Sequence, residues 1–368
     1  MAVTVRNAVL ASDGPRIMDA RLRVCAVEVN KRSQCRAMEG NLLSQLPYAK
    51  LSPDVIMEAL DGAGFLCDGR ILALNSYENR VYQLGMEDGG FLVAKFYRPG
   101  RWTDEAILEE HAFSAELVGH EIPVVAPIVV DGTTLHEHAG YRFAMFPRQG
   151  GRWPELGSVD DRVWMGRFVG RIHAVGAVTE FTHRLVLSVE RMGEESAAYL
   201  MASDWLPDHL VESYEAIVEQ LLESITECFT RAGSYRELRI HGDCHPGNVL
   251  WTIDGPHFVD LDDCIMGPAV QDLWLFLSGD RNERTVQLQD LLKGYSQFFE
   301  FDYRELHLIE ALRTLRMIHY TAWIARRWID PAFPRAFPWF AENKYWEEHV
   351  LALREQAAVL SEPPLEVV

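Results

Sequence analysis

Long apolar runs are missing from this sequence of 368 residues. A membrane-spanning helix needs about 20 consecutive apolar residues, and the longest candidate, IPVVAPIVV, is short and broken by prolines. The first residues also lack the uninterrupted apolar stretch of a secretory signal peptide. We therefore expect no insertion into a membrane.

Basic residues are scarce relative to acidic ones. Lys and Arg together number 35 against 54 Asp and Glu, which gives a formal net charge of −19. A nucleic-acid-binding protein needs a basic face that neutralises phosphates. This balance argues against a nucleic-acid partner and favours neutral or cationic ones.

Paired cysteines are absent as well. The six cysteines include no C-x-x-C pair and stand far apart, at Cys25, Cys35, Cys67, Cys228, Cys244 and Cys264. In a chain of this length such spacing is typical of reduced thiols rather than of a disulfide framework. We expect a cytoplasmic protein.

The beginning of the chain differs from the rest. Residues 1–47 have weak periodicity and a cluster of basic residues, so we expect a flexible extension or an upstream translation start with Met38 as the true one. The first clear helix signal follows, with Ser52 as N-cap, Pro53 as first helical residue and Gly64 at the end.

Short β-type runs then alternate with turns. The runs before the next helix are ILALNSY, NRVYQLG and GFLVAKFYR, and MEDGG joins the last two as a hairpin turn. A helical pattern covers residues 103–120, with Thr103 as N-cap, and two further strand candidates are VAPIVVDG and YRFAMFP. The pattern predicts a sheet of about five antiparallel strands with one helix inserted after the third.

Helical periodicity dominates after residue 150. Apolar residues recur three and four apart in 160–178, 208–229, 268–279 and 304–328. The strand candidates in this part are LRIHGD, NVLWTI and HFVDLDD. We predict an α+β, bilobal protein-kinase-like fold with a small β-rich, ATP-binding lobe over residues 48–147 and a larger, mainly helical, catalytic lobe over residues 148–368.

The stretches HGDCHPGNVLW and FVDLDD carry the clearest chemistry. His241, Asp243 and Asn248 form the pattern H-x-D-x-x-x-x-N, and Asp260 follows on the next strand candidate. Phosphoryl transfer from a magnesium nucleotide needs a carboxylate that accepts the proton of the acceptor hydroxyl and oxygen ligands for the metal. The protein-kinase signature has this spacing, with Arg in place of Gly242. We interpret Asp243 as the base and Asn248 and Asp260 as Mg²⁺ ligands.

Two other interpretations of this loop exist. It could be a polar turn between strands, in which Asp and Asn only make turn hydrogen bonds. It could also be a transition-metal site made from His241, Asp243, Cys244 and His245, but these residues are crowded on one loop and lack a partner pair elsewhere. The order of the lobes favours the kinase interpretation.

A kinase also needs a small-lobe lysine for the phosphates and a helix glutamate that holds it. Lys95 lies in the apolar run FLVAKFYR, where an unpaired ammonium is costly. The next helix supplies Glu109 and Glu110, and we favour Glu110 because its neighbours pack around it more naturally. The alternative is that Lys95 is an ordinary surface lysine.

A glycine-rich phosphate loop is missing between the first two strands. LNSYENRVY has no glycine, so Asn75, Ser76 and Asn79 are the available phosphate donors, with a plain hairpin turn as an equal alternative. We expect adenine to lie in a crevice near Met145 and Phe146, between the lobes.

Several residues of the large lobe allow two interpretations. Asp272 could brace the amides of the catalytic loop or be a plain acid at a helix start. Asp262 and Asp263 could add charge to the metal site or cap a turn, and Cys244 is expected to be a small buried thiol. We expect residues 323–340 to pack as core, with the lining of an acceptor pocket as the alternative.

Seven segments together resemble a known group. HGDCHPGNVLW, FVDLDD, GPAVQDLW, LNSYENRVYQ, KFYRPGRW, ILEEH and DPAFPRAFPW are similar to bacterial stress response kinases, within the aminoglycoside phosphotransferase and choline kinase-like group. The resemblance covers residue 48 to the C-terminus. It implies a protein-kinase-like fold and ATP-dependent phosphorylation of protein serine and threonine, with autophosphorylation, in an envelope-stress response.

The resemblance also implies residue roles. The group's proton acceptor matches Asp243, its Mg²⁺ ligands match Asn248 and Asp260, and its small-lobe lysine matches Lys95. An A-P-E segment is absent, so control by a phosphorylated activation loop is not expected. We thus take Asp243, Asp260 and Lys95 as catalytic, and Lys95, Glu110, Asn75, Ser76, Met145 and Phe146 as nucleotide-binding residues.

The sequence therefore predicts a monomeric kinase that transfers the γ-phosphoryl group of ATP in line to a protein hydroxyl, with Mg²⁺ as cofactor. One alternative is a small-molecule kinase acting on choline, an aminoglycoside or another amino-alcohol, since an acidic large lobe would suit a cation. Another is a pseudokinase scaffold, which the presence of Lys95, Asp243, Asn248 and Asp260 disfavours.

Overall fold

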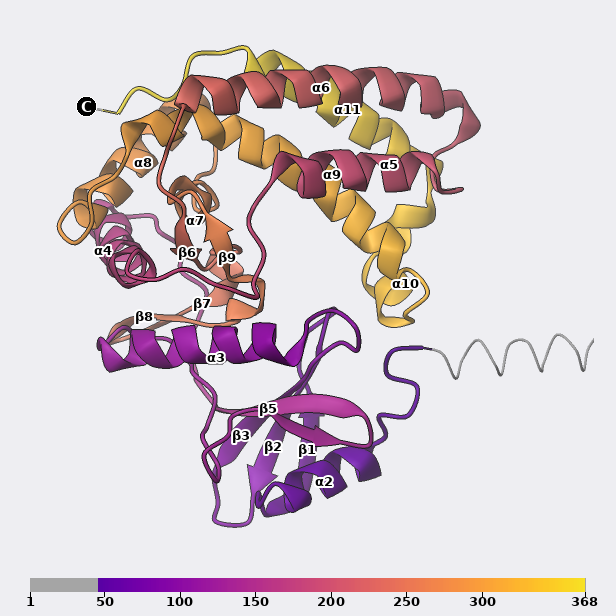
Figure 1. Ribbon diagram of the computed structural model, residues 1–368, viewed down its shortest axis with the longest axis vertical. Helices are drawn as coiled ribbons and strands as arrows, with labels where there is room; N and C mark the ends of the chain where they lie inside the picture. Colours follow the sequence, from indigo (N-terminus) through magenta and orange to yellow (C-terminus); the bar gives the residue numbers. More distant parts are fainter. Residues whose placement is uncertain (1–45, 368) are drawn as a thin grey trace, which may run out of the picture. The chain divides into compact units, whose positions relative to one another are not determined.

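The computed structural model describes residues 46–367 (Figure 1). Contacts divide the chain into two units, Met1–Ser52 and Pro53–Val368. In the first unit the described residues form a turn, in which the Ala49 N–H donates to the Leu46 carbonyl and the Leu51 N–H to the Tyr48 carbonyl. The expected extension, with its alternative start at Met38, lies outside the described residues, apart from residues 46 and 47.

The small lobe of the second unit is built on one antiparallel sheet. Its strands are β1 (Cys67–Ala73), β2 (Arg80–Met86), β3 (Phe91–Phe96), β4 (His136–His138) and β5 (Tyr141–Pro147). They lie in the order β1-β2-β3-β5-β4, and every neighbouring pair is antiparallel. The predicted five-stranded sheet is confirmed.

The position predicted for the fourth strand is wrong. Residues 125–132 form no ladder with the sheet: they contribute an isolated bridge between Val130 and Thr133, a hydrogen bond from the Ile128 N–H to the Met145 carbonyl, and one from the Val125 N–H to the Phe258 carbonyl. Pro127 has no N–H to donate to a ladder, which confines proline to sheet edges and bulges. The fourth strand is instead the short segment His136–His138, which pairs with β5.

Two helices accompany this sheet where the sequence predicts them. α2 (Pro53–Gly62) buries Ile56, Ala59 and Leu60 at helical spacing, and Gly64 follows it with a φ of +83°. α3 (Asp104–Gly119) is capped by Thr103, whose side chain accepts a hydrogen bond from the Ala106 N–H. α3 carries the glutamates that the site requires.

The large lobe is mainly helical, as predicted. Its longer helices and its strands are α4 (Val159–Gly176), α5 (Glu195–Met201), α6 (Val211–Ala232), β6 (Leu238–Ile240), β7 (Val249–Thr252), β8 (Gly255–Phe258), β9 (Ile265–Gly267), α7 (Val270–Trp274), α8 (Arg281–Tyr295), α9 (Ile309–Arg327), α10 (Ala332–Ala336) and α11 (Asn343–Leu360). β6 pairs with β9 and β7 pairs with β8. Across residues 46–367 none of the helices is long and apolar enough to cross a bilayer.

Some helices of this lobe were not predicted. α8 begins with a capping box between Asp280 and Glu283, a sequence signal that could have located it. α7 is much shorter than the helix predicted over residues 268–279. It is followed by a turn in which the Leu277 N–H donates to the Trp274 carbonyl, so the apolar run leaves the helix early.

α4 and α8 approach each other closely because both carry glycine at the contact. A Cβ on Gly166 would lie 1.9 Å from the Leu291 carbonyl oxygen, and one on Gly294 would lie 1.9 Å from the Val163 carbonyl oxygen. No side chain fits at these distances. The contact brings Tyr295 of α8 against His173 of α4, and this pair supports the site.

Candidate active site

One buried carboxylate fixes the backbone of the loop after β6 through hydrogen bonds. Asp272 on α7 accepts hydrogen bonds from the backbone N–H groups of His241, at 2.7 Å, and Gly242, at 2.9 Å. His173 lies between Asp272 and Tyr295, with its Nε2 3.1 Å from Asp272 Oδ2 and its Nδ1 2.9 Å from the Tyr295 hydroxyl. Of the two interpretations of Asp272, the one in which it braces the loop amides is the one that these hydrogen bonds support.

Gly242 lets this loop lie against the segment that follows Asp260. Its φ is +82°, and a Cβ there would lie 2.2 Å from the Asp263 carbonyl oxygen. A side chain would therefore be strained by the backbone conformation and would also collide with the facing chain. This explains why the protein-kinase arginine is replaced by glycine at this position.

Asp243 projects from this loop toward α9. Its Oδ1 lies 2.6 Å from Nη1 of Arg316, and its Oδ2 lies 3.4 Å from Nε2 of His245. Burial alone would raise the pKa of the Asp243 carboxyl, but His245 and Arg316 outweigh it and lower the pKa. The carboxylate is therefore ionised at neutral pH, as a proton acceptor must be.

Asn248 and Asp260 are brought to one edge by the β7–β8 hairpin. Val249 pairs with Phe258, and the Val259 N–H donates to the Asn248 carbonyl at 3.0 Å. The Asn248 amide nitrogen donates to the Asp243 carbonyl at 3.0 Å, which leaves its amide oxygen as the end able to hold a cation. Asp260, 53% exposed in its side chain, is similarly accessible.

These two donors fit a magnesium ion shared with a nucleotide. Mg²⁺ prefers oxygen ligands and is commonly held by one or two protein groups, phosphates and water. Among residues 46–367 no cluster of three or more His, Cys, Asp or Glu side chains could hold a metal by itself. In particular, His241 donates through Nε2 to the Val259 carbonyl and Cys244 is buried, so the loop does not assemble the alternative transition-metal site.

Lys95 is the buried cation of the site. Its Nζ lies 3.3 Å from Glu110 Oε1, 3.1 Å from Asp260 Oδ1 and 3.1 Å from Asp262 Oδ1. Burial opposes the charge, but Asp262, Glu110 and Asp260 together hold the pKa of Lys95 well above its ordinary value. The interpretation of Lys95 as a surface lysine is therefore wrong.

Glu110, rather than Glu109, is the partner of Lys95, as the sequence analysis favoured. Glu109 instead accepts hydrogen bonds from three consecutive backbone N–H groups, at 2.7–2.9 Å, in Thr182, His183 and Arg184. Burial raises the pKa of Glu110, and Lys95 opposes this rise. The two adjacent glutamates therefore have separate tasks, one inside the site and one at the large-lobe loop.

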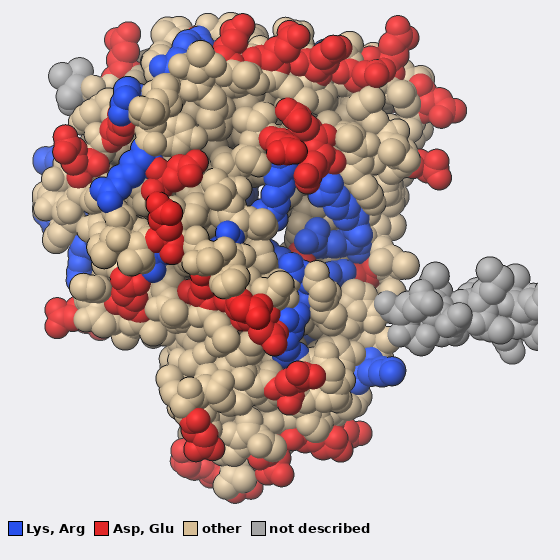
Figure 2. All heavy atoms as spheres, viewed as in Figure 1, with Lys and Arg blue, Asp and Glu red and all other residues tan. Residues whose placement is uncertain are grey.

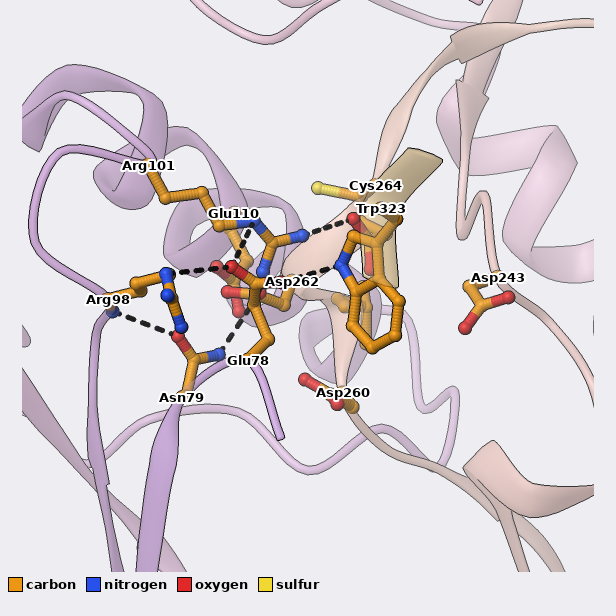
Figure 3. A network of polar contacts seen from close by, with 12 residues as sticks. Glu78, Asn79, Arg98, Arg101, Glu110, Asp243, Asp260, Asp262, Cys264 and Trp323 are labelled. Carbon is orange, nitrogen blue, oxygen red and sulfur yellow. Dashed lines mark hydrogen bonds and ion pairs between the residues drawn. The ribbon is translucent and has the colours of Figure 1, made fainter. Parts of the chain in front are cut away.

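Asp262 joins the two lobes rather than adding free negative charge to the metal site. It is buried and contacts Lys95. It also contacts Arg101 and the Asn79 amide nitrogen, the last at 3.1 Å (Figure 3). Burial opposes ionisation, but Arg101 and Lys95 outweigh it and lower the pKa of Asp262. Asp263 is likewise paired with Arg101, at 2.5 Å.

Glu78 makes a second connection between the lobes. Its carboxylate accepts a hydrogen bond from Trp323 Nε1 at 2.7 Å and lies 2.5 Å from Arg327 Nε, both on α9. Nearby, Asp330 binds Arg80 at 2.6 Å and Arg98 at 3.0 Å. Sequence reasoning missed these residues, because their partners lie more than two hundred positions apart along the chain.

The predicted phosphate loop lies between β1 and β2. Both ends of the Asn79 amide are used inside the protein, since its oxygen accepts from the Arg98 N–H at 3.1 Å and its nitrogen donates to Asp262. The prediction of Asn79 as a phosphate donor is therefore wrong. Asn75 is exposed, and the Ser76 hydroxyl donates to the Asn79 carbonyl at 3.2 Å. Phosphate binding by these two residues stays a prediction.

The residues predicted near adenine lie on β5. Met145 is buried and pairs with Ala94 of β3, while Phe146 is partly exposed and pairs with Val93. The backbone carbonyl of Met145 accepts a hydrogen bond from the Ile128 N–H at 2.7 Å. This strand ends at the connector between the lobes, where the sequence predicts an adenine site. Adenine binding by Met145 and Phe146 stays a prediction.

A cavity of about 700 Å³ opens beside Asp243. Its lining includes Tyr77, Arg101 and Trp102 from the small lobe, and Arg316 and Trp323 from α9. Both interpretations of the segment 323–340, core packing and cavity lining, hold. Trp323 and Phe337 line the cavity, while Phe333 and Phe340 are buried in the core.

The comparisons with known proteins agree with this geometry. Residues 70–309 match the phosphotransferase enzyme family, which is more than half of the chain. Stress response kinase A of Escherichia coli strain K12 is 44% identical over 324 residues, covering 88% of this chain and 98% of that protein. The chain belongs to the phosphotransferase enzyme family.

Two further similarities place this phosphotransferase. A protein of Salmonella typhimurium strain LT2, named serine/threonine protein kinase RdoA, is 43% identical over 320 residues, covering 87% of this chain and 97% of that protein. The solved structure of amicoumacin kinase hAmiN, in complex with AMP-PNP, Ca²⁺ and Ami, has a TM-score of 0.65 at 19% identity, covering 85% of this chain and 95% of that one. At this identity the second similarity shows the fold alone.

Proposed function

We propose that this phosphotransferase transfers the γ-phosphoryl group of ATP to serine and threonine hydroxyls of proteins, including its own, with Mg²⁺ as cofactor. The observation that carries the proposal is the position of Asp243, at the lip of a large cavity and on the same loop as Asn248. The names of the two bacterial relatives support the protein acceptor and the stress response. We further propose a cytoplasmic monomer.

The residues divide the reaction between them. Lys95, kept charged by three carboxylates, binds the phosphates of the nucleotide and is oriented by Glu110. Asn248 and Asp260 would hold Mg²⁺, which supplies positive charge against the phosphate oxygens when bound. Asp243 accepts a hydrogen bond from the acceptor hydroxyl, aims its oxygen at phosphorus and takes the proton as the bond forms.

The low pKa of Asp243 suits this task. Phosphoryl transfer passes through a loose transition state in which the nucleophile needs little prior deprotonation, so the carboxylate works mainly by orienting the hydroxyl. A strongly basic group is not required. The reaction instead requires an ionised group that is held in one place, and Arg316 and His245 hold the Asp243 carboxylate in this way.

The test is incubation of purified protein with radiolabelled ATP and Mg²⁺, with a generic protein substrate in one arm and a panel of small alcohols, choline and aminoglycosides among them, in the other. We expect label on the protein substrate and on the kinase itself, and phosphosite mapping should find serine or threonine. Label on small alcohols alone would establish a small-molecule kinase instead, and no ATP consumption in either arm would indicate a pseudokinase.

A pair of variants makes this test specific. Asp260→Ala removes a proposed metal ligand and is expected to abolish labelling. Asp254→Ala changes an exposed aspartate in the turn of the same β7–β8 hairpin and is expected to label like the wild type. Equal labelling by both variants would remove Asp260 from the mechanism.

A further inference from the structure

The cavity beside Asp243 is basic although the chain is strongly acidic. Its lining holds six arginines, Arg98, Arg101, Arg191, Arg316, Arg326 and Arg327, against four carboxylates, Glu78, Glu195, Asp243 and Asp263. The whole chain has a formal net charge of −19. Figure 2 shows Lys and Arg side chains gathered around a hollow in this face, with Asp and Glu spread over the surrounding surface. The local charge of the cavity is thus opposite to that of the protein.

Most of these arginines are neutralised by carboxylates of the protein. Arg98 pairs with Asp330, Arg101 with Asp262 and Asp263, Arg316 with Asp243, and Arg327 with Glu78. Two are not. Among residues 46–367, Arg191 forms no side-chain hydrogen bond or ion pair, and the Arg326 side chain donates only to a backbone carbonyl, that of Glu195 at 3.0 Å.

Arg191 is the more informative of the two. It lies on the short π-helix Glu190–Glu194 and is partly buried against the cavity. Burial lowers the pKa of Arg191, and Arg101 and Arg326 lower it further; Asp263 and Glu195 oppose this fall without outweighing it. A partly desolvated cation without a partner is costly unless an anion neutralises it.

His319, also in the cavity wall, experiences the same positive field. Its Nδ1 lies 3.1 Å from the Ser196 hydroxyl. Burial, together with Arg191 and Arg326, lowers the pKa of His319 to about 4. At neutral pH it is uncharged, so it adds a polar group to this end of the cavity without adding to the repulsion between the arginines.

We infer that this cavity binds an anionic acceptor: a serine or threonine segment with a carboxylate or phosphate on a neighbouring residue, which Arg191 and Arg326 bind. The inference rests on the proposed function and names its substrate class. Guanidinium groups bind both carboxylates and phosphates through paired hydrogen bonds. The acceptor hydroxyl and its anion enter one cavity, with Asp243 at the hydroxyl and the two arginines at the anion.

This charge distribution disfavours the alternative acceptor considered from the sequence. An acidic large lobe would suit a cationic amino-alcohol, but the net charge of a whole protein does not describe its cavities. Arg191 and Arg326, which have no carboxylate partner, would repel a cation in the acceptor space, and like charges across an interface select against a ligand. The argument for an amino-alcohol from overall acidity therefore fails at the site itself.

The experiment compares four serine peptides of equal length whose residues next to the serine are glutamate, phosphoserine, glutamine or lysine. We expect kcat/KM to be at least about tenfold higher for the two anionic peptides than for the glutamine peptide, and lowest for the lysine peptide. Preference for one anion over the other distinguishes carboxylate from phosphate. Equal rates for all four peptides would overturn the inference and leave the protein-kinase proposal intact.

Variants assign the preference to the two arginines. Arg191→Gln and Arg326→Gln are each expected to raise KM for the anionic peptides several-fold while leaving KM for ATP and the rate with the glutamine peptide unchanged. Arg191→Lys, which keeps the charge, should retain most of the preference. Arg167→Gln changes an exposed arginine of α4 that lies outside the cavity lining and should behave like the wild type.

Two outcomes are decisive against the idea. An Arg191→Gln, Arg326→Gln double variant that folds, binds ATP and keeps the full anionic preference would overturn the assignment of these residues. Failure to phosphorylate any peptide, with ATP consumed on a small alcohol, would overturn the proposed function and this inference together.

Discussion

Nη1 of Arg316, in the middle of α9, lies 2.6 Å from Oδ1 of Asp243, the residue 73 positions earlier that we propose as the base. The long helix therefore fixes the orientation of a carboxylate on a distant loop. Nothing in the local pattern around Arg316 marks it for this role. The pair also sets the electrostatics of Asp243, because Arg316 is one of the groups that lower its pKa.

Replacing Arg316 by Gln should therefore move the pH dependence of the reaction. Activity requires ionised Asp243, so the acid limb lies at low pH while Arg316 lowers the pKa, and removal of Arg316 raises that pKa. We expect the acid limb of kcat/KM to shift to higher pH and the plateau to fall about 10- to 100-fold. An unchanged acid limb in Arg316→Gln, measured beside Arg167→Gln, would contradict the pairing.

Lys95→Met should remove both function and stability. The substitution leaves Glu110 buried without its cation and Asp262 with Arg101 as its remaining cationic partner, and breaking a buried pair typically costs about 3–5 kcal/mol. Denaturant unfolding should show this loss, and turnover should fall below detection. Lys293→Met, at an exposed position of α8, is the control and should leave both the stability and the turnover close to those of the wild type. If Lys95→Met unfolds at the same denaturant concentration as the wild type, Lys95 does not stabilise the protein by compensating the buried carboxylates.

Gly242→Ala tests the close approach of the catalytic loop. Two separate effects act at this position, the φ of +82° and the 2.2 Å distance from a Cβ to the Asp263 carbonyl oxygen. Gly132→Ala is the matched control, because its φ is +81° and a Cβ there meets nothing within 4 Å. We expect about 1 kcal/mol of destabilisation in the control and clearly more, with loss of activity, in Gly242→Ala. Equal effects would show that the loop can move away.

The buried carboxyl of Glu305 should make the free energy of unfolding depend on pH. Burial raises the pKa of Glu305 to about 8, although its carboxylate accepts a hydrogen bond from the Val270 N–H at 2.8 Å. In the folded protein the Glu305 carboxyl therefore keeps a proton that it releases at about pH 4.3 in the unfolded chain. The contribution of this group to the free energy of unfolding should fall as pH rises from about 4.3 to about 8 and then level off.

Glu305→Gln removes this titration while keeping an acceptor for Val270. The thermal unfolding temperature of the variant should therefore fall less than that of the wild type between pH 5 and pH 8. Glu300→Gln, at an exposed position before the 3-10 helix Tyr303–Leu308 that carries Glu305, is the control and should follow the wild type. Parallel curves for wild type and Glu305→Gln would show that Glu305 is ionised in the folded protein.

The parts of the site that the sequence predicts are those in which spacing along the chain fixes geometry. Asp243, Asn248 and Asp260 lie on one loop and one hairpin, so their intervals place them at a common edge. Lys95 is recognisable because a charge inside an apolar strand needs a partner, and α3 follows with Glu110. Asp272 could be anticipated because a helix start beside the loop can accept its amide hydrogen bonds.

The remaining parts depend on contacts between distant segments. The pairs Glu78–Arg327, Arg80–Asp330 and Arg316–Asp243 join elements whose approach follows from the packing of the whole second unit. The basic acceptor cavity could not be predicted for the same reason, because its arginines come from the loop after β3, the π-helix and α9. Overall composition pointed in the opposite direction, toward a cationic partner.

The central claim is that Asp243 receives the proton of the acceptor hydroxyl within a working ATP site, and Asp243→Asn tests it most directly. Asparagine preserves the size of the side chain but cannot take the proton. We predict that phosphate transfer from radiolabelled ATP falls about 10²- to 10⁴-fold, while the dissociation constant for ATP, measured on the same preparation, is unchanged. Full turnover in Asp243→Asn would contradict the account.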